Sequence, residues 1–183
     1  MHKPSPVPYP GEHLHAVAEV RFGGRAMCRP ARKNAIVRAM TFANPSPEEI
    51  CQMLRSIHTI AVVGLSSNPE RPSFRVASAM QSHGYRIVPV VGARHGAQEL
   101  LGEVAYANLE DIPFPVDMVD VFRASEYVPA IVESCIALGI QRLWLQEGVI
   151  HEAAAQHARD AGLTVVMNQC MWRDYSRLCG QTP

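Results

Sequence analysis

Short apolar runs alternate along the chain with longer segments in which apolar residues recur every three or four positions. Such short runs are typical of strands buried on both faces, and the longer segments are typical of amphipathic helices. The pattern predicts five strands, at Thr59–Val63, Tyr85–Val91, Val116–Phe122, Arg142–Gln146 and Leu163–Met167. Because helices of about ten residues separate the strands, we expect an α/β fold with one five-stranded parallel sheet, right-handed crossovers and helices on both faces.

Capping residues mark where the helices begin and end. Ser46 is a favourable N-cap, Pro47 suits the first helical position, and two glutamates in the first turn complement the helix dipole. Ser125 is a second predicted N-cap, and Gly84 is placed for a left-handed C-cap. After the helix that begins at Pro47, further helices are predicted at 73–83, 125–139, 150–161 and 174–178, with one short capping-box turn at 108–111.

Residues 1–44 do not share this pattern. Prolines alternate with other residues from Pro4 to Pro10, and a basic stretch, RPARKNAIVRAM, precedes the first helix. We expect residues 1–44 to be a disordered N-terminal extension and residues 45–183 to form the folded domain. A targeting arm is also Arg-rich with few acidic residues, so that alternative stays open. Met40, just before the first helix, favours the extension.

Composition and charge narrow the classes of function. The chain has 183 residues, 48% of them hydrophobic, which suits one domain with a real core. No apolar run reaches the ~18 residues of a membrane helix, and the N-terminus lacks the apolar segment of a secretory signal. The formal net charge is zero, but residues 1–40 carry +5 and residues 41–183 carry −5. An acidic domain without a basic run is a poor nucleic-acid binder.

Cysteines and histidines point to neither a disulfide framework nor a metal. The cysteines are odd in number and widely spaced, and no CxxC pair occurs, which predicts reduced thiols in a cytoplasmic protein. His151 and His157 lack the i, i+4 spacing of a helical zinc pair. Cys170 follows the fifth strand, but Asn168 and Gln169 beside it are not bases, so we interpret it as a structural thiol. No catalytic signature occurs, which favours a protein that is not an enzyme.

The turn after the first strand is the strongest candidate site. In the stretch IAVVGLSSNPERPSFRVASAM, from Ile60 to Met80, the strand stops at one glycine and a helix of small residues follows. Ligands of open parallel sheets bind beyond the carboxyl ends of the strands, and the N–H groups at a helix N-terminus favour a phosphate. The candidate residues of this turn are Gly64, Ser66, Ser67, Asn68, Arg71, Ser73 and Arg75. An ordinary βα connection, in which the polar residues only shape the turn, fits the spacing equally well.

The ends of the later strands add further candidates. The second strand ends in Val91–Gly92, without the carboxylate that often holds the ribose of a dinucleotide, so NAD is disfavoured. Phe122 either stacks on a base or packs in the core, and Arg123 suits a phosphate. Gln146 ends the fourth strand, and Gly148 either admits a ligand close to the backbone or forms the turn.

Five blocks of the sequence agree, in the same order, with one known family. They are TIAVVGLSSNPERPSFRVASAMQSHGYRIVPV, ELLGEVAYANLEDIP, VDMVDVFR, WLQEGVI and AGLTVVMNQC, within residues 45–178. Through them the chain resembles the small bacterial and archaeal CoA-binding proteins. These are single Rossmann-like domains similar to the CoA-binding domain of the succinyl-CoA synthetase alpha subunit, so the resemblance implies the same fold here.

The resemblance also implies a ligand and a set of contacts. It implies that coenzyme A or an acyl-CoA binds with its phosphates at the turn from Gly64 to Ser73. The residues carried over by block match are Gly64, Ser66, Ser67, Asn68, Arg71, Arg123, Gln146 and Gly148. One departure is that the family's Pro-Val-Asn-Pro after its second strand is here 89–92, PVVG, which removes any contact of that asparagine side chain.

Three functions follow from these observations. The first is non-catalytic binding of CoA or acyl-CoA, because the synthetase uses a phosphorylated histidine in a second domain for which this chain has no room. The second is a component of an acyl-CoA synthetase-like enzyme that is completed by a separate ATP-grasp partner. The third is an NAD(P)-binding regulatory domain.

Overall fold

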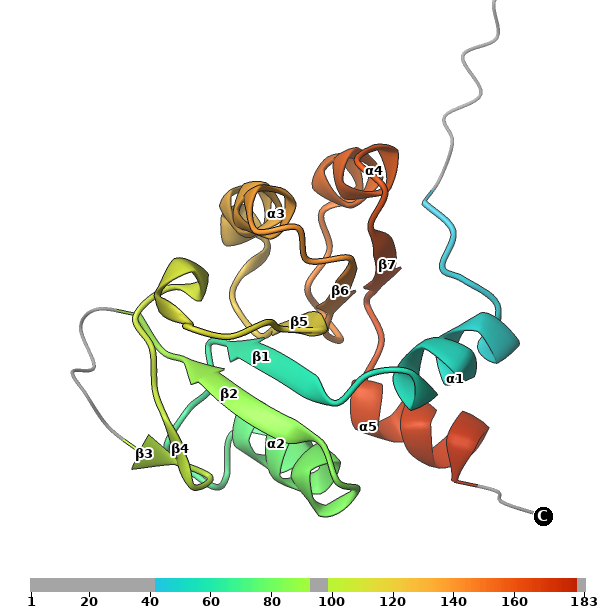
Figure 1. Ribbon diagram of the computed structural model, residues 1–183. Helices are drawn as coiled ribbons and strands as arrows, with labels where there is room; N and C mark the ends of the chain where they lie inside the picture. Colours follow the sequence, from blue (N-terminus) through green and yellow to red (C-terminus); the bar gives the residue numbers. More distant parts are fainter. Residues whose placement is uncertain (1–41, 93–98, 181–183) are drawn as a thin grey trace, which may run out of the picture. The chain divides into compact units, whose positions relative to one another are not determined.

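The computed structural model describes residues 42–92 and 99–180, which contain one parallel sheet and the helices that cover it (Figure 1). The strands of this sheet are β1 (Thr59–Val63), β2 (Arg86–Val90), β5 (Met118–Val121), β6 (Arg142–Leu145) and β7 (Thr164–Met167). They lie in the order β2-β1-β5-β6-β7, and every neighbouring pair is parallel. The predicted five-stranded parallel sheet is therefore confirmed.

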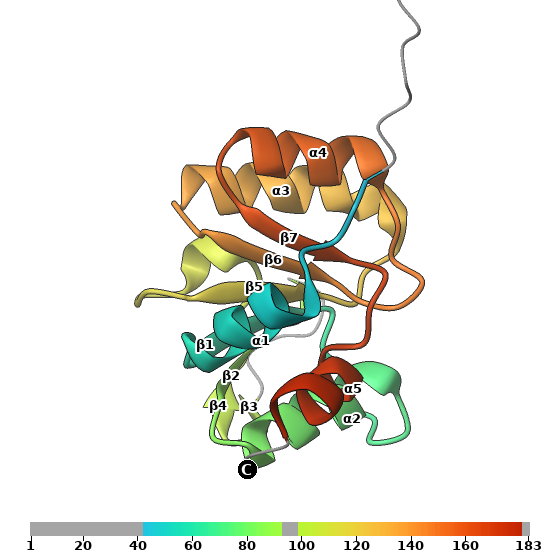
Figure 2. The same cartoon turned by 90° about the vertical axis from the view of Figure 1, so that its right-hand side faces the viewer.

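Helices cover both faces of the sheet, as predicted. The helices of one face are α3 (Val128–Ala137) and α4 (Glu152–Asp160), and those of the other are α1 (Pro47–Arg55), α2 (Pro72–Ser82) and α5 (Met171–Asp174) (Figure 2). The shorter turns are η2 (Leu109–Asp111), η3 (Ser125–Tyr127) and a π-helical turn, η4 (Tyr175–Cys179). No helix in the described part of the chain is long and apolar enough to cross a membrane. The described residues form one Rossmann-like α/β domain.

Alternate side chains of the strands enter two separate cores. Ile60 and Trp144 are fully buried on the face covered by α1, α2 and α5, whereas Ala61 and Leu143 are fully buried beneath α3 and α4. Both faces of the sheet are thus buried. This is why the strand sequences are continuous apolar runs instead of alternating apolar and polar residues.

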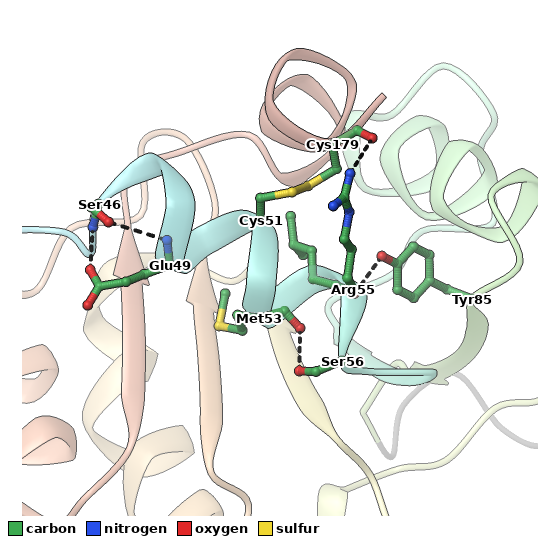
Figure 3. Close-up of a disulfide and its surroundings, with 9 residues drawn as sticks. Ser46, Glu49, Cys51, Met53, Arg55, Ser56, Tyr85 and Cys179 are labelled. Carbon is green, nitrogen blue, oxygen red and sulfur yellow. Dashed lines mark hydrogen bonds between the residues drawn. A yellow bond between two sulfur atoms is a disulfide. The ribbon is translucent and has the colours of Figure 1, made fainter. Parts of the chain in front are cut away.

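The first helix begins as its sequence predicts. The N–H of Ser46 donates to the Glu49 carboxylate at 2.7 Å, and the N–H of Glu49 donates to the Ser46 hydroxyl oxygen at 3.3 Å (Figure 3). This capping box satisfies two N–H groups that a helix start leaves unpaired. Pro47 follows at the first helical position.

A disulfide corrects the prediction that all cysteines are reduced. Cys51 on α1 is bonded to Cys179 in η4, with their Cα atoms 5.6 Å apart (Figure 3). The two residues are 128 positions apart, so spacing along the chain could not reveal a pair that forms only because α1 and η4 pack together. Cys135 and Cys170 are free thiols, and Cys28 lies outside the described residues.

Two local features differ from the prediction. Ser125 does not cap the helix after β5, because its hydroxyl oxygen accepts from the N–H of Ile150 at 2.9 Å and the turn η3 precedes α3. A short antiparallel pair, β3 (Glu99–Leu100) and β4 (Glu103–Val104), was not predicted. Strands of two residues are too short to show an apolar period.

Residues 42–44, which the prediction assigned to the N-terminal extension, contact the domain. The Asn44 side chain donates to the carbonyl of Met167 at 2.8 Å and accepts from its N–H at 2.7 Å. The Arg159 guanidinium donates to the carbonyl of Ala43 at 2.8 Å and lies over the ring of Phe42. The rest of the predicted extension, residues 1–41, lies outside the described residues.

Candidate functional site

The strands that follow β1 along the chain lie on both sides of it, with β2 on one side and β5 on the other. The chain passes from β1 through α2 to β2 on one side and then crosses to β5 on the other side of β1. At such a switch point the connections leave the carboxyl ends of the two strands in opposite directions, which opens a crevice for a ligand. Val63 and Val121 are register partners at these ends, so the crevice begins at the residues that follow them.

Gly64 is the first of these residues, and its own backbone conformation and its close neighbours require a glycine at this position. Its φ is +90°, a region that residues with side chains rarely adopt. A Cβ atom there would lie 3.1 Å from Cδ of Arg123 and 3.3 Å from the carbonyl carbon of Phe122. The single glycine of the turn is therefore explained by the close passage of the chain after β5, whether or not a ligand also approaches it.

The side chains of the turn hold its shape. The Ser73 hydroxyl oxygen accepts from the N–H of Ser66 at 3.1 Å, and the Ser66 hydroxyl oxygen accepts from the N–H of Asn68 at 3.1 Å. The amide oxygen of Asn68 accepts from the N–H of Glu70 at 2.9 Å. These bonds use the side-chain oxygens as acceptors, so the hydroxyl hydrogens of both serines remain to be donated.

The helix that follows the turn starts without a side-chain cap. Arg71 is the N-cap of α2, no side chain accepts at this end, and the first intrahelical bond runs from the N–H of Arg75 to the carbonyl of Arg71. Pro72 has no N–H, so Ser73 and Phe74 carry the two N–H groups without an intrahelical acceptor. Uncapped N–H groups and the positive end of the helix dipole together attract an anion.

A hollow of about 560 Å³ opens beside this helix end, and we call it the turn hollow. Six of the predicted site residues line it, namely Gly64, Ser66, Arg71, Ser73, Phe122 and Gln146. The lining residues outside the predicted set are Pro72, Val76, Glu147, Val149 and Cys170, the last of which was interpreted as a structural thiol. The carboxyl ends of β1, β5 and β6 and the start of α2 thus contribute to one concave surface.

Arg75 lines an adjoining hollow of about 600 Å³, which we call the C-terminal hollow. Its lining shares Pro72, Val76, Glu147 and Cys170 with the turn hollow and adds Trp172, Arg173, Ser176 and Arg177 from the last helical segment. Glu147 and Arg173 form an ion pair at 3.0 Å. Neither Arg71 nor Arg75 has a carboxylate partner among the described residues, so both guanidinium groups are available to an anionic ligand.

The other predicted residues do not line the turn hollow. Arg123 points to the α3 face, where it lines a hollow of about 230 Å³ and covers the ring of Tyr127. Ser67 and Asn68 line none of these three hollows. Gly148 also lines none of them, and its N–H donates to the side chain of Asn168 at 2.8 Å, which fits the turn-forming alternative.

Sequence reasoning missed Asp120, a charged residue inside strand β5. Its side chain is 1% exposed, and the side-chain nitrogen of Gln146 donates to its two oxygens at 2.9 and 3.1 Å. Burial raises the pKa of Asp120 to about 8, against the lowering effect of hydrogen bonds from Gln146 and the backbone of Val121. An aspartate within the apolar run VDMVDVF was the available signal, because an acidic residue in a doubly buried strand needs a dedicated partner.

The chemistry available in the two adjoining hollows suits binding. Cys170 is half-buried and borders both hollows, but no histidine lines either of them to act as its base. Within residues 42–92 and 99–180, no three His, Cys, Asp or Glu side chains gather as a metal site would require. The lining instead combines hydroxyls, guanidinium groups, an amide and an aromatic ring.

Known proteins are similar to this chain over most of its described length. Residues 58–176 match the model of the CoA binding domain family. The uncharacterized protein YneT of Bacillus subtilis is 41% identical over 128 residues, which cover 70% of this chain and 93% of YneT. The solved structure of the cell-free ID.343 protein of Thermus thermophilus is 34% identical with a TM-score of 0.70 and covers 73% of this chain and 99% of its own. A hypothetical protein of Pyrococcus horikoshii OT3 is 33% identical with a TM-score of 0.70, over 77% of this chain and 100% of its own. On the family match and these identities, the chain belongs to the CoA-binding domain family.

Proposed function

We propose that this protein binds coenzyme A or an acyl-CoA without catalysing a reaction, and that the phosphates of the ligand lie at the turn from Gly64 to Ser73. The observation that carries this proposal is the uncapped start of α2 at the wall of the turn hollow. CoA is a polyanion, and a helix start with two free N–H groups next to an arginine is a suitable anion site.

The neighbouring groups support the same position for the phosphates. Arg71 lines the turn hollow, and no carboxylate of the described residues neutralises it. Ser66 and Ser73 line it as well, with hydroxyl hydrogens left to donate. The fit to a phosphate therefore rests on charge, backbone N–H groups and hydroxyls together.

The size of the site suits a long ligand. The turn hollow and the C-terminal hollow share four lining residues and measure about 560 and 600 Å³. Both volumes fall in the usual range of small-molecule sites. A CoA molecule whose phosphates lie at the turn has room to extend past Phe122 and Gln146 on one side and past Cys170 on the other.

The non-catalytic part of the proposal rests on the side chains that line the hollows. Cys170 is the strongest nucleophile among them, and neither hollow places a histidine beside it. The carboxylate that they share, Glu147, is paired with Arg173. We therefore assign the side chains to holding the ligand rather than to transforming it.

Reversing the charge of Arg71 tests this proposal. In Arg71→Glu the new carboxylate repels the phosphates, so the Kd for CoA should rise by roughly thirtyfold, equivalent to about 2 kcal/mol. The salt dependence of binding should also become smaller. Isothermal titration calorimetry at two salt concentrations measures both effects.

Arg55→Glu is the matched control, because Arg55 is exposed at the end of α1, lines neither hollow and makes only a long side-chain hydrogen bond, to the carbonyl of Cys179 at 3.4 Å (Figure 3). It makes the same charge change and should leave the Kd for CoA unchanged. Equal affinities of the wild type, Arg71→Glu and Arg55→Glu would remove Arg71 from the site.

A further inference from the structure

Asp120 and Gln146 form a buried polar pair at the base of the turn hollow. Asp120 lies in β5, in register with Val62 of β1 and Trp144 of β6, so its side chain enters the same face as theirs. Gln146 follows β6 by one residue, is 3% exposed and lines the hollow. The pair therefore connects the buried centre of the sheet to the ligand surface.

The hydrogen bonds of this pair decide which end of the Gln146 amide faces the ligand. The side-chain nitrogen of Gln146 donates to both carboxylate oxygens of Asp120. Once it is ionised, above its raised pKa, the Asp120 carboxylate only accepts, and the backbone N–H of Val121 is a second donor toward it. Since the amide nitrogen is committed to Asp120 in this form, the group that Gln146 has left for the hollow is its carbonyl oxygen.

A fixed acceptor oxygen selects the part of the ligand that can lie against it. A phosphate carries only acceptors at neutral pH and is repelled by a carbonyl oxygen, whereas a hydroxyl or an amide N–H donates to it. In CoA such donors belong to the ribose and to the pantetheine arm. The acceptor at Gln146 therefore favours the orientation in which the phosphates stay at the start of α2, across the hollow.

We propose that Asp120 is a specificity-determining residue, which holds the Gln146 amide so that the site takes a hydroxyl or N–H donor of the ligand at the end of β6. The inference rests on the proposed binding of CoA and adds the group that orients the ligand. Asp120 acts through Gln146 and does not itself line the hollow.

Asp120→Asn tests the inference. The Asn oxygen can serve the Val121 N–H while its NH2 group donates to Gln146, which turns the amide of Gln146 and presents its nitrogen to the hollow. In buffer alkaline enough to ionise Asp120 in the wild type, this change should raise the Kd for CoA about three- to tenfold. Met118→Leu is the matched control, since Met118 is fully buried on the same strand and face, and it should change the Kd less than about twofold.

A double variant distinguishes a lost hydrogen-bond direction in Asp120→Asn from a folding defect of that variant. In Asp120→Asn with Gln146→Glu, the Asn NH2 group donates to the new carboxylate, whose other oxygen again faces the hollow as an acceptor. Its Kd for CoA should return to within about threefold of the wild type. Adenosine 3′,5′-bisphosphate and 4′-phosphopantetheine, the two halves of CoA, locate the donor, because only the half that contacts Gln146 should lose affinity in Asp120→Asn.

The outcomes separate this inference from the proposed function. If the wild type binds CoA and Asp120→Asn binds it as tightly as Met118→Leu does, the orienting role of Asp120 is wrong while CoA binding stands. If the double variant stays as weak as Asp120→Asn, the direction of the hydrogen bond does not matter and the inference is again wrong. If the wild type binds neither CoA nor either half, the proposed function fails and this inference fails with it.

Discussion

Gly64 stands where β1 ends beside the chain leaving β5, and a side chain at this position would be strained and would meet Arg123 and the backbone of Phe122. The sequence marked this glycine as a candidate for ligand contact, and the structure adds a reason that needs no ligand. The N–H of Gly64 donates to the carbonyl of Val90 at 2.8 Å, so this glycine holds β1 to the end of β2 and offers no free donor of its own.

Asp120 makes the stability of the domain depend on pH. Burial raises its pKa from the ordinary value of 3.8 to about 8, so between these values the folded protein holds a proton that the unfolded chain has released. The stabilisation from this group is complete below about pH 4 and is lost as the pH rises through about 8. Its contribution to the free energy of unfolding should fall by at least about 1 kcal/mol across this window.

Urea unfolding of the wild type and of Asp120→Asn across this pH window measures the effect. Asn does not titrate, so the wild type should lose stability relative to the variant as the pH rises. A constant difference between the two proteins at every pH would mean that Asp120 has an ordinary pKa in the fold.

At the residue scale, the sequence indicated which residues gather at one edge of the sheet, whereas their contact with a ligand stays a prediction. Six predicted residues do line the turn hollow, because residues after parallel strands meet at one edge of the sheet. Arg123 was grouped with Phe122, but neighbours along an extended segment point to opposite faces, and only Phe122 faces this hollow. Asp120 was missed because its partner is 26 positions away and only the sheet brings Gln146 to it.

Among the elements, residues 42–44 before α1 pack against the domain. Asn44 makes two hydrogen bonds with the backbone of Met167, and Phe42 packs against the core beneath α4. A chain that begins at Met40 keeps these contacts, and we expect its melting temperature and its affinity for CoA to match those of the full chain.

A chain that begins at Pro45 loses the same contacts. Two hydrogen bonds of about 1 kcal/mol each correspond to a melting temperature lower by roughly 4–8 °C for a domain of this size. Differential scanning calorimetry of the three chains measures both effects. If the melting temperature of the chain that begins at Met40 were already much lower than that of the full chain, residues before Met40 would stabilise the domain.

The elements also show which structural features a local sequence pattern is sufficient to predict. The capping box at Ser46 and the apolar run of β1 depend on neighbours in the chain, and both were predicted with their bounds. The pair β3–β4 was missed because two-residue strands carry no period, and the disulfide between Cys51 and Cys179 was missed because it depends on how distant helices pack.

In the domain as a whole, the switch point of the open parallel sheet and the uncapped start of α2 lie at the same edge of the sheet. The family match spans residues 58–176. The alternation of strands and helices was enough to predict the sheet and its covered faces. The order of the strands could not be read from periodicity, because each crossover can return to either side of β1. That order places the ends of β1 and β5 side by side and so creates the crevice.

Thermal unfolding with CoA, NAD and NADP, on protein shown by native mass spectrometry to be free of ligand, tests the central claim most directly. A ligand at a hundredfold excess over its Kd stabilises the native state by about 2.7 kcal/mol, so saturating CoA should raise the melting temperature by roughly 5–10 °C. NAD and NADP at the same concentration should raise it much less, because the turn has one glycine and Val91–Gly92 after β2 offers no carboxylate to the ribose. A larger shift with NAD than with CoA, or no shift with CoA, would contradict the assignment of this site to coenzyme A.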